Sequence, residues 1–287
     1  MQKRTPQRSH TKGVPKKSGI RKETFPRKEK SAKSVVLNTK TSWGKEASWY
    51  AEHLEQGDTY HAKVILPNLM RIVAPASRMH ILEIGCGEGF FARAFADAGA
   101  SVIASDVGKE LIAVAQEKGG GPEYFVSPAE DLSWVRLRSM DTVVAVLTLQ
   151  NMEYIEPVMK EVAKTLRPGG RFVFVLNHPT FRIPKATEWG YDEARGVQYR
   201  RIDGYLSARS EKMDMHPGKR GGKSFTYSYH RSLQDYMKAL RSAGFAITRL
   251  EEWISHKTSE PGPKAKAENT ARKEFPLFML VEATVIH

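Results

Sequence analysis

The sequence predicts an α/β protein with a doubly wound, mostly parallel sheet, because short apolar runs alternate with segments of helical apolar spacing. The first apolar run, residues 81–84, has the length of a buried strand. Three glycines follow at alternate positions, Gly85, Gly87 and Gly89, and the apolar residues within 90–98 then recur at helical spacing. Glycine lacks a Cβ and accepts positive φ, so this strand–glycine–helix unit allows the backbone to approach a nucleotide closely.

A carboxylate follows the second predicted strand, residues 101–105, which runs into Asp106. An acid about twenty residues after the glycine turn lies at the carboxyl edge of the neighbouring strand, where it can hold a ribose diol. A dinucleotide-binding fold requires the pattern G-x-G-x-x-G, and the third glycine of that pattern is replaced by Phe90. The glycine spacing therefore argues against a nicotinamide cofactor.

Residues 83–89, Glu-Ile-Gly-Cys-Gly-Glu-Gly, resemble motif I of the class I S-adenosylmethionine-dependent methyltransferases. The resemblance covers about residues 43–287 and implies a Rossmann-like sheet of seven strands, the last antiparallel, with S-adenosylmethionine as cofactor. Residues 129–132 match a family segment that borders the adenine ring, whereas Pro128 departs from it, which favours backbone contacts there. The cofactor-binding residues implied are Glu83, Gly85, Cys86, Gly87, Gly89, Asp106, Val107, Ala129, Glu130 and Leu147.

The remaining chain continues the alternation of strands and helices. A helix beginning at Tyr60 is expected to be interrupted at Pro67, because proline lacks an N–H. The turn 166–170, Leu-Arg-Pro-Gly-Gly, precedes a strand and is frequent in the family that the chain resembles. Further strands are expected at residues 124–126, 141–147, 171–176, 247–254 and 278–285.

His178 is the candidate catalytic residue, because it lies just past the carboxyl end of the fifth strand, across from the glycine turn. An imidazole there can take a proton from an incoming nucleophile. It resembles the His-Pro that follows this strand in many bacterial small-molecule methyltransferases. Two other interpretations stay open, contact with the substrate and a structural role at the end of the strand.

Residues 180–230 form an insertion that we expect to cover the cleft as a flap. Period-two alternation in 199–205 and 224–230 predicts two strands that pair with each other through a loop around 216–222. Their aromatic side chains can stack on an aromatic acceptor or a nucleobase, or simply cover apolar surface. The candidate substrate-binding residues, in and beside this flap, are Asn151, Asn177, Tyr199, Arg201, Tyr227, Tyr229 and His230.

The formal net charge of +13 is concentrated in residues 1–40, which hold thirteen Lys or Arg against two acids, a net charge of +11. This segment has few apolar residues and no helical stripe, so the sequence predicts a disordered basic tail preceding a methyltransferase domain over 41–287. Either it tethers the protein to RNA or a ribosome surface, or it is a dispensable solvated extension. The segment around Trp43 and Trp49 resembles the helices that cover the cofactor in the family, although both side chains can equally serve packing.

Composition adds further expectations about compartment and ligands. The single cysteine, Cys86, permits no internal disulfide, which favours a reducing, cytoplasmic location, and no apolar run has the length of a membrane span. No His/Cys cluster has metal-ligand spacing, so no metal is expected. The resemblance implies methyl transfer to an O, N or C nucleophile, with a small molecule, aromatic acceptors included, as the leading substrate. Two alternatives stay open, an RNA- or ribosome-directed methyltransferase and a non-catalytic cofactor-binding RNA assembly factor. Nothing in the sequence sets an oligomeric state.

Overall fold

The computed structural model describes residues 43, 46–47, 51–52, 57–215 and 224–286. The basic segment 1–40, Trp49 and the loop 216–222 lie outside the described residues, so the predictions made for them stay predictions.

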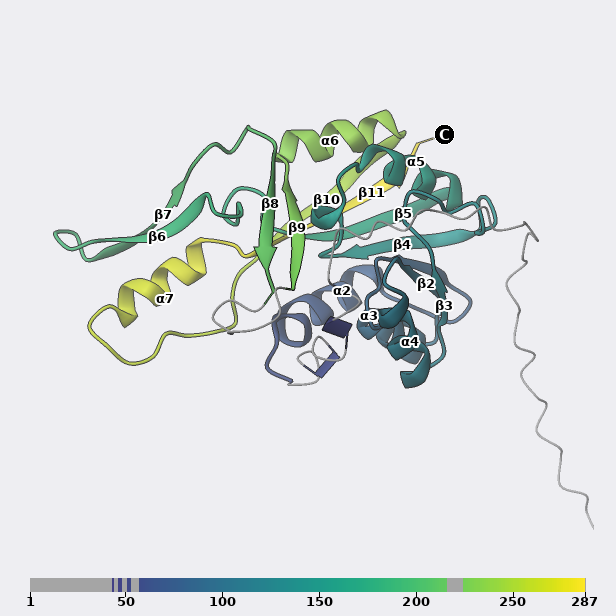
Figure 1. Cartoon of the computed structure of the whole chain (residues 1–287), viewed down its shortest axis with the longest axis horizontal. Helices are drawn as coiled ribbons and strands as arrows, with labels where there is room; N and C mark the ends of the chain where they lie inside the picture. Colours follow the sequence, from purple (N-terminus) through teal and green to yellow (C-terminus); the bar gives the residue numbers. More distant parts are fainter. Residues whose placement is uncertain (1–42, 44–45, 48–50, 53–56, 216–223, 287) are drawn as a thin grey trace, which may run out of the picture.

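A seven-stranded sheet forms the centre of the molecule, with strand order β10-β11-β5-β4-β1-β2-β3 (Figure 1). The first five strands in the chain run parallel to one another, and β11 is antiparallel to both β5 and β10. This confirms the predicted doubly wound sheet with its antiparallel last strand. The strands are β1 (His80–Ile84), β2 (Ser101–Asp106), β3 (Glu123–Val126), β4 (Met140–Val146), β5 (Leu166–Asn177), β10 (Phe245–Trp253) and β11 (Phe278–Val285).

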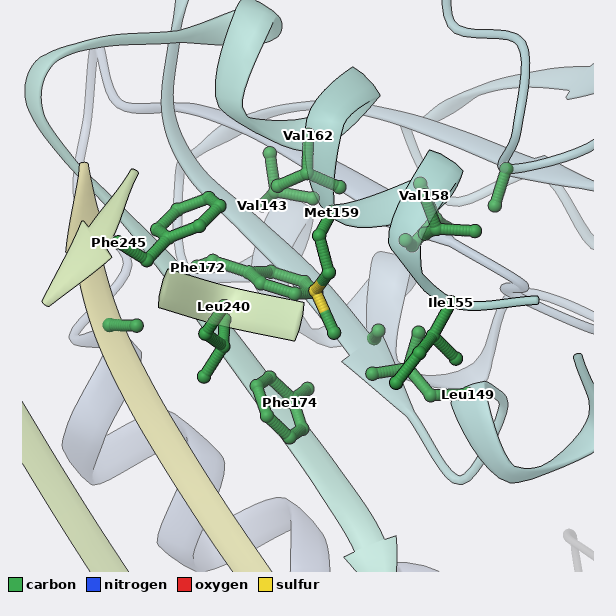
Figure 2. Packing of buried hydrophobic residues seen from close by; sticks show 14 of the residues in the cluster. Val143, Leu149, Ile155, Val158, Met159, Val162, Phe172, Phe174, Leu240 and Phe245 are labelled. Carbon is green, nitrogen blue, oxygen red and sulfur yellow. The ribbon is translucent and has the colours of Figure 1, made fainter. Parts of the chain in front are cut away.

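Helices cover both faces of this sheet, because successive residues of its central strands point to opposite sides. In β4, Val143 and Ala145 pack on one face against helices α5 (Glu156–Thr165) and α6 (Leu233–Ser242). Figure 2 shows this layer, where Phe172 and Phe174 of β5 lie under Met159 and Leu240. Val144 and Val146 point to the other face, which is covered by α2 (Leu66–Val73), α3 (Phe90–Asp97) and α4 (Lys109–Lys118).

The helix that was predicted to begin at Tyr60 is not interrupted at Pro67, so this prediction is wrong. A π-helical turn, His61–Ile65, runs directly into α2, and Pro67 lies in the first turn of α2. Proline is tolerated there because its fixed φ suits a first helical turn and the missing N–H removes little. The helix therefore passes through Pro67.

The insertion after β5 forms two hairpins, so the predicted pairing of strand 199–205 with strand 224–230 is wrong. One hairpin pairs β6 (Thr187–Asp192) with β7 (Val197–Ile202), and the other pairs β8 (Arg209–Asp214) with β9 (Phe225–His230). The first hairpin closes locally where the Gly196 N–H donates to the Asp192 carbonyl at 2.8 Å. A short loop costs less chain entropy than a long one, so each strand pairs with its near neighbour.

The two hairpins lie in different places (Figure 1). Strand β7 packs against α7 (Ala265–Glu274), and this hairpin extends away from the central sheet. Strand β9 contacts the short 3₁₀ helix η3 (Leu149–Asn151), which follows β4. The β8–β9 hairpin thus contacts the turn at the carboxyl end of β4.

Candidate functional site

The glycine turn after β1 is held in a conformation that only glycine adopts easily. Gly85, Gly87 and Gly89 have φ of 64°, 57° and 84°. A Cβ at residue 85 would overlap Thr148 at the end of β4, and a Cβ at residue 89 would overlap the ring of Tyr124 in β3. The turn is therefore pressed against the ends of two other strands and leaves backbone, without side chains, at the carboxyl edge of the sheet.

Asp106 ties the end of β2 to this turn. Its two carboxylate oxygens accept the backbone N–H of Gly87 at 2.9 Å and of Gly108 at 2.7 Å. Burial raises the pKa of Asp106, and the backbone hydrogen bonds oppose that shift. Each oxygen keeps a further lone pair, so the carboxylate retains the capacity to accept hydrogen bonds from a diol.

A buried charged cluster lies in and around the glycine turn. Glu88 forms ion pairs with Arg93 at 2.7 Å and Lys118 at 2.9 Å. Glu83 is 1% exposed, and burial is the main cause that raises its pKa to about 8, with the neighbouring Glu88 and Asp106 adding to the shift. Sequence reasoning missed the role of Glu88, because the only signal was its place between two loop glycines.

The turn after β3 borders the same edge. The Ser127 hydroxyl donates to the Asp131 carbonyl at 3.0 Å and accepts the indole N–H of Trp134 at 3.0 Å, which closes the turn. Within it Ala129 is buried and Glu130 exposed, while Val107, after β2, is 39% exposed. An exposed apolar side chain beside a tight turn is suited to contact the face of a flat ring.

The end of β4 has a strained backbone. Leu147 has φ of 53°, in the left-handed region that non-glycine residues rarely adopt. The Asn151 amide donates to the Leu147 carbonyl at 3.2 Å, and the Leu147 N–H donates to Val175 of β5 at 2.8 Å. Strain of this kind persists where surrounding contacts hold it, often at functional sites. Asn151 thus supports the turn, and its substrate contact stays a prediction.

His178 is buried after β5, with partners on both ring nitrogens. Its Nε2 is 2.7 Å from Glu252 Oε1 of β10, and its Nδ1 accepts the N–H groups of Thr180 at 3.2 Å and Phe181 at 3.4 Å. Burial lowers the pKa of His178, although the hydrogen bond to Glu252 opposes the shift. These partners describe a ring that organises the loop after β5, and catalysis by His178 stays a prediction.

The candidate substrate residues of the insertion fall into separate groups. On β7, Arg201 is exposed and forms ion pairs with Glu188 and Asp203, and the Tyr199 ring covers Gly190. On β9, the rings of Tyr227 and Tyr229 lie 6.3 Å apart, centroid to centroid. The side chain of His230 is buried, with Nε2 2.8 Å from the carbonyl of Tyr205. The structure thus divides these residues between the two hairpins, and β9 is the strand that contacts η3.

These parts define a nucleotide-type cofactor site at the carboxyl edge of a doubly wound sheet. The glycine backbone, the Asp106 carboxylate and the buried acid Glu83 fit a ligand with a ribose diol and a cationic amino acid group. One oxygen of Glu83 has no hydrogen-bond partner among the described residues, and a cation nearby would stabilise its charged form. The described residues bring no three metal-ligating side chains together, and none of their helices is long and apolar enough to cross a bilayer.

Comparison with known proteins gives the same class. Residues 82–174 match the model of a methyltransferase domain. The crystal structure of an S-adenosylmethionine-dependent methyltransferase from Mesorhizobium loti is 29% identical and superposes with a TM-score of 0.61, over 76% of this chain and 96% of the other. A methyltransferase of this kind from Clostridium acetobutylicum shares the fold at 15% identity, with a TM-score of 0.56 over 86% of this chain and all of the other. The chain thus has the fold of the class I S-adenosylmethionine-dependent methyltransferases and contains a methyltransferase domain.

Curated relatives match only part of the chain. A ubiquinone biosynthesis O-methyltransferase from Xanthomonas euvesicatoria is 34% identical over 102 residues, which are 34% of this chain and 43% of the relative. One from Xylella fastidiosa is 29% identical over 136 residues, 46% of this chain and 55% of the relative. The chain thus spans about half the length of the curated relatives it matches.

Proposed function

We propose that this protein transfers the methyl group of S-adenosylmethionine to an O, N or C nucleophile of a small acceptor, with an aromatic acceptor favoured. The observation that carries the proposal is the meeting of Gly85, Thr148 and Asp106 at one edge of the sheet. Tyr227 and Tyr229 of β9, the strand that contacts η3, offer aromatic faces beside this edge. The O-methyltransferase names of the curated relatives support an oxygen nucleophile, although the first of them matches only 34% of this chain.

Bound S-adenosylmethionine supplies an electrophilic methyl whose bond to sulfur breaks as the new bond forms, with the electron pair left on a neutral thioether. The chain's own contribution is to orient the acceptor, exclude water and let a protic nucleophile lose its proton. The glycine turn positions S-adenosylmethionine, and the ends of β4 and β5 limit where the methyl acceptor can lie. No metal is needed for this division of roles.

Calorimetry with S-adenosylmethionine and NAD tests the cofactor assignment. We expect a dissociation constant on the order of micromolar for S-adenosylmethionine and no heat of binding for NAD. Methyl transfer from labelled S-adenosylmethionine to a panel of phenols, amines and total RNA then tests the acceptor class. Tight NAD binding would overturn the assignment, and labelling of RNA alone would move the substrate to nucleic acid.

We also propose that residues 1–40 tether the protein to a polyanion such as RNA. Support comes from charge alone: residues 41–287 hold 32 bases and 30 acids, so +11 of the net +13 lies in the segment. Counterion release makes such binding fall steeply with salt. A variant lacking residues 1–40 should keep its melting temperature and S-adenosylmethionine affinity but lose RNA affinity. If this variant still binds RNA tightly in moderate salt, RNA recognition lies in the remaining domain.

A further inference from the structure

Arg182, in the loop after β5, is a desolvated cation without an acidic partner. Among the described residues no carboxylate pairs with it, and the only hydrogen bond of its side chain runs from Nη1 to the Asn177 side-chain carbonyl at 2.6 Å. Its guanidinium lies over the Phe278 ring, 5.5 Å from the centroid. Burial lowers the pKa of Arg182, as expected for a cation that lacks a countercharge.

Arg171 offers a comparison, because its contacts are those of an arginine with a structural role. Arg171 donates to Glu282 at 2.9 Å and to the backbone carbonyls of Ile72 and Val73 at 3.1 and 2.9 Å. Glu282 neutralises the charge of Arg171, and both terminal nitrogens of its guanidinium have acceptors. Arg182 has five N–H donors and leaves most of them without a protein acceptor among the described residues.

Arg200 adds positive potential around Arg182, and no carboxylate of the described residues forms an ion pair with Arg182. Arg200 lies close enough to lower the pKa of Arg182 further, and it donates only to neutral groups, the Phe181 carbonyl at 3.0 Å and the Thr187 hydroxyl at 2.7 Å. Two acids of this edge are already paired, Glu252 with His178 and Asp58 with His256. An anion arriving from solvent would therefore meet the guanidinium of Arg182 with its positive charge not neutralised.

A short series of contacts joins this cation to the glycine turn. Thr148 lies against Gly85, and the preceding residue, Leu147, is hydrogen-bonded to Val175 of β5. Two residues further along β5, the N–H of Asn177 donates to the Gln150 side chain of η3 at 3.2 Å, and Asn177 holds Arg182. Neighbouring strands lie about 5 Å apart, so Asn177, the residue that holds Arg182, lies about one strand spacing from the end of β4.

Aromatic side chains surround the same loop. Phe278 also contacts the ring of Tyr60 at 5.7 Å, and Phe181 lies 5.4 Å from Phe275, centroid to centroid. A planar carboxylate can accept two parallel N–H groups from an arginine fork, and ring faces favour a flat apolar body next to it. Charge and shape thus point to one chemical class.

We propose that Arg182 binds the carboxylate of the methyl acceptor, so that the acceptor is a small aromatic carboxylate. The proposal rests on the proposed methyltransferase function and adds its substrate class. It makes Arg182 a specificity residue, with Asn177 holding its guanidinium in place.

Binding of benzoate and benzamide to the full-length protein saturated with S-adenosylhomocysteine tests this without requiring turnover. We expect benzoate to bind at least about tenfold more tightly than benzamide, since only benzoate offers an anion to the fork. Arg182→Met should remove that preference, and Arg182→Lys should keep only part of it because an ammonium lacks the fork. The matched control is Arg195→Met, an exposed arginine of the same insertion, which should bind benzoate as the native protein does.

Asn177→Asp gives an isosteric test that does not depend on how well an Arg182 variant folds. The new carboxylate would supply the missing partner of Arg182, so benzoate affinity should fall at least about tenfold while the melting temperature rises. Equal affinities for benzoate and benzamide in the native protein would overturn the proposal. So would an Arg182→Met protein that loses S-adenosylhomocysteine instead of benzoate, because the arginine would then serve the cofactor.

The failure of the proposed function would look different. A native protein that binds no S-adenosylhomocysteine contradicts the methyltransferase assignment, and benzoate titrated without the cofactor product still tests the Arg182 site. A preference for benzoate that persists in Arg182→Met would place the anion site elsewhere.

Discussion

The carboxylate of Asp106 accepts the backbone N–H of Gly87 at 2.9 Å and so joins the end of β2 to the turn after β1. The same carboxylate accepts the N–H of Gly108 at 2.7 Å at the start of the next helix. The acid expected to hold the ribose therefore also fixes the shape of the backbone that the cofactor would contact. Binding and loop geometry depend on one side chain.

Asp106→Ala should weaken S-adenosylmethionine binding by about 1–3 kcal/mol, roughly fivefold to 150-fold, because buried polar groups lose their acceptor. It should also lower the free energy of unfolding, since two backbone N–H groups lose their partner. Calorimetry and urea denaturation measure the two effects, with exposed Asp97→Ala as the control. Native-like affinity in Asp106→Ala would place the ribose contact on another residue.

Gly85→Ala should destabilise the protein more than Gly169→Ala. Both residues have positive φ, 64° and 76°, so both alanines cost about 1–2 kcal/mol of backbone strain. Only the Cβ at 85 overlaps another side chain, that of Thr148, whereas nothing lies within 4 Å of a Cβ at 169. Overpacking should add about 1–3 kcal/mol, measured by denaturant unfolding. Thr148→Gly in the Gly85→Ala background should recover that excess, and equal costs at the two glycines would contradict the close approach.

Glu83 should make the cofactor-free protein less stable as pH rises. The pKa of Glu83 in the folded protein is about 8, above the ordinary value of 4.5 for a glutamate. Its protonated form therefore stabilises the fold fully below pH 4.5, and this stabilisation is lost as pH rises towards 8. In this window the free energy of unfolding should fall by at most about 1.4 kcal/mol per pH unit from this group. Urea denaturation at pH 5.5, 6.5 and 7.5 should show a shallower fall in Glu83→Gln. The idea fails if both proteins have the same slope.

His178→Ala separates a catalytic role from a structural one. If His178 acts as a base, His178→Ala should turn over about a hundredfold more slowly and keep its cofactor affinity and stability. Its contacts with Glu252 and the Thr180 N–H predict instead a loss of about 1–3 kcal/mol in unfolding free energy.

Because burial lowers the folded pKa of His178, its contribution to stability should be present above pH 6.5 and decline as pH falls below that value. His178→Gln, which keeps a polar side chain without a titrating ring, should remove this pH dependence. Melting temperatures from pH 5 to 7.5 measure it. An unchanged melting temperature in His178→Ala, together with slow turnover, would support the catalytic role.

Local sequence patterns determined the sheet, the glycine turn and the acid after β2. Strand runs, the alternate glycines 85, 87 and 89, and the position of Asp106 each follow from rules that act within about twenty residues. Their agreement explains why the alternating strands and helices could be predicted, whereas the count of seven strands and the antiparallel β11 were implied by the family resemblance. The two-hairpin pairing in the insertion could not, because both predicted strands had the same period-two alternation and nothing in that alternation specifies a partner.

Only the tertiary structure decided which side chains meet. Thr148 is 63 positions from Gly85 in the chain, yet it explains why residue 85 must be glycine. Glu252 and the backbone of the next loop occupy both nitrogens of His178, for which the sequence left a catalytic, a substrate-binding and a structural role open. Nothing in the sequence distinguishes Arg182 from the other arginines, whereas in the folded chain burial removes water from it and no described carboxylate pairs with it. Desolvation and partner choice depend on the packing of distant segments, so they appear only in the folded chain.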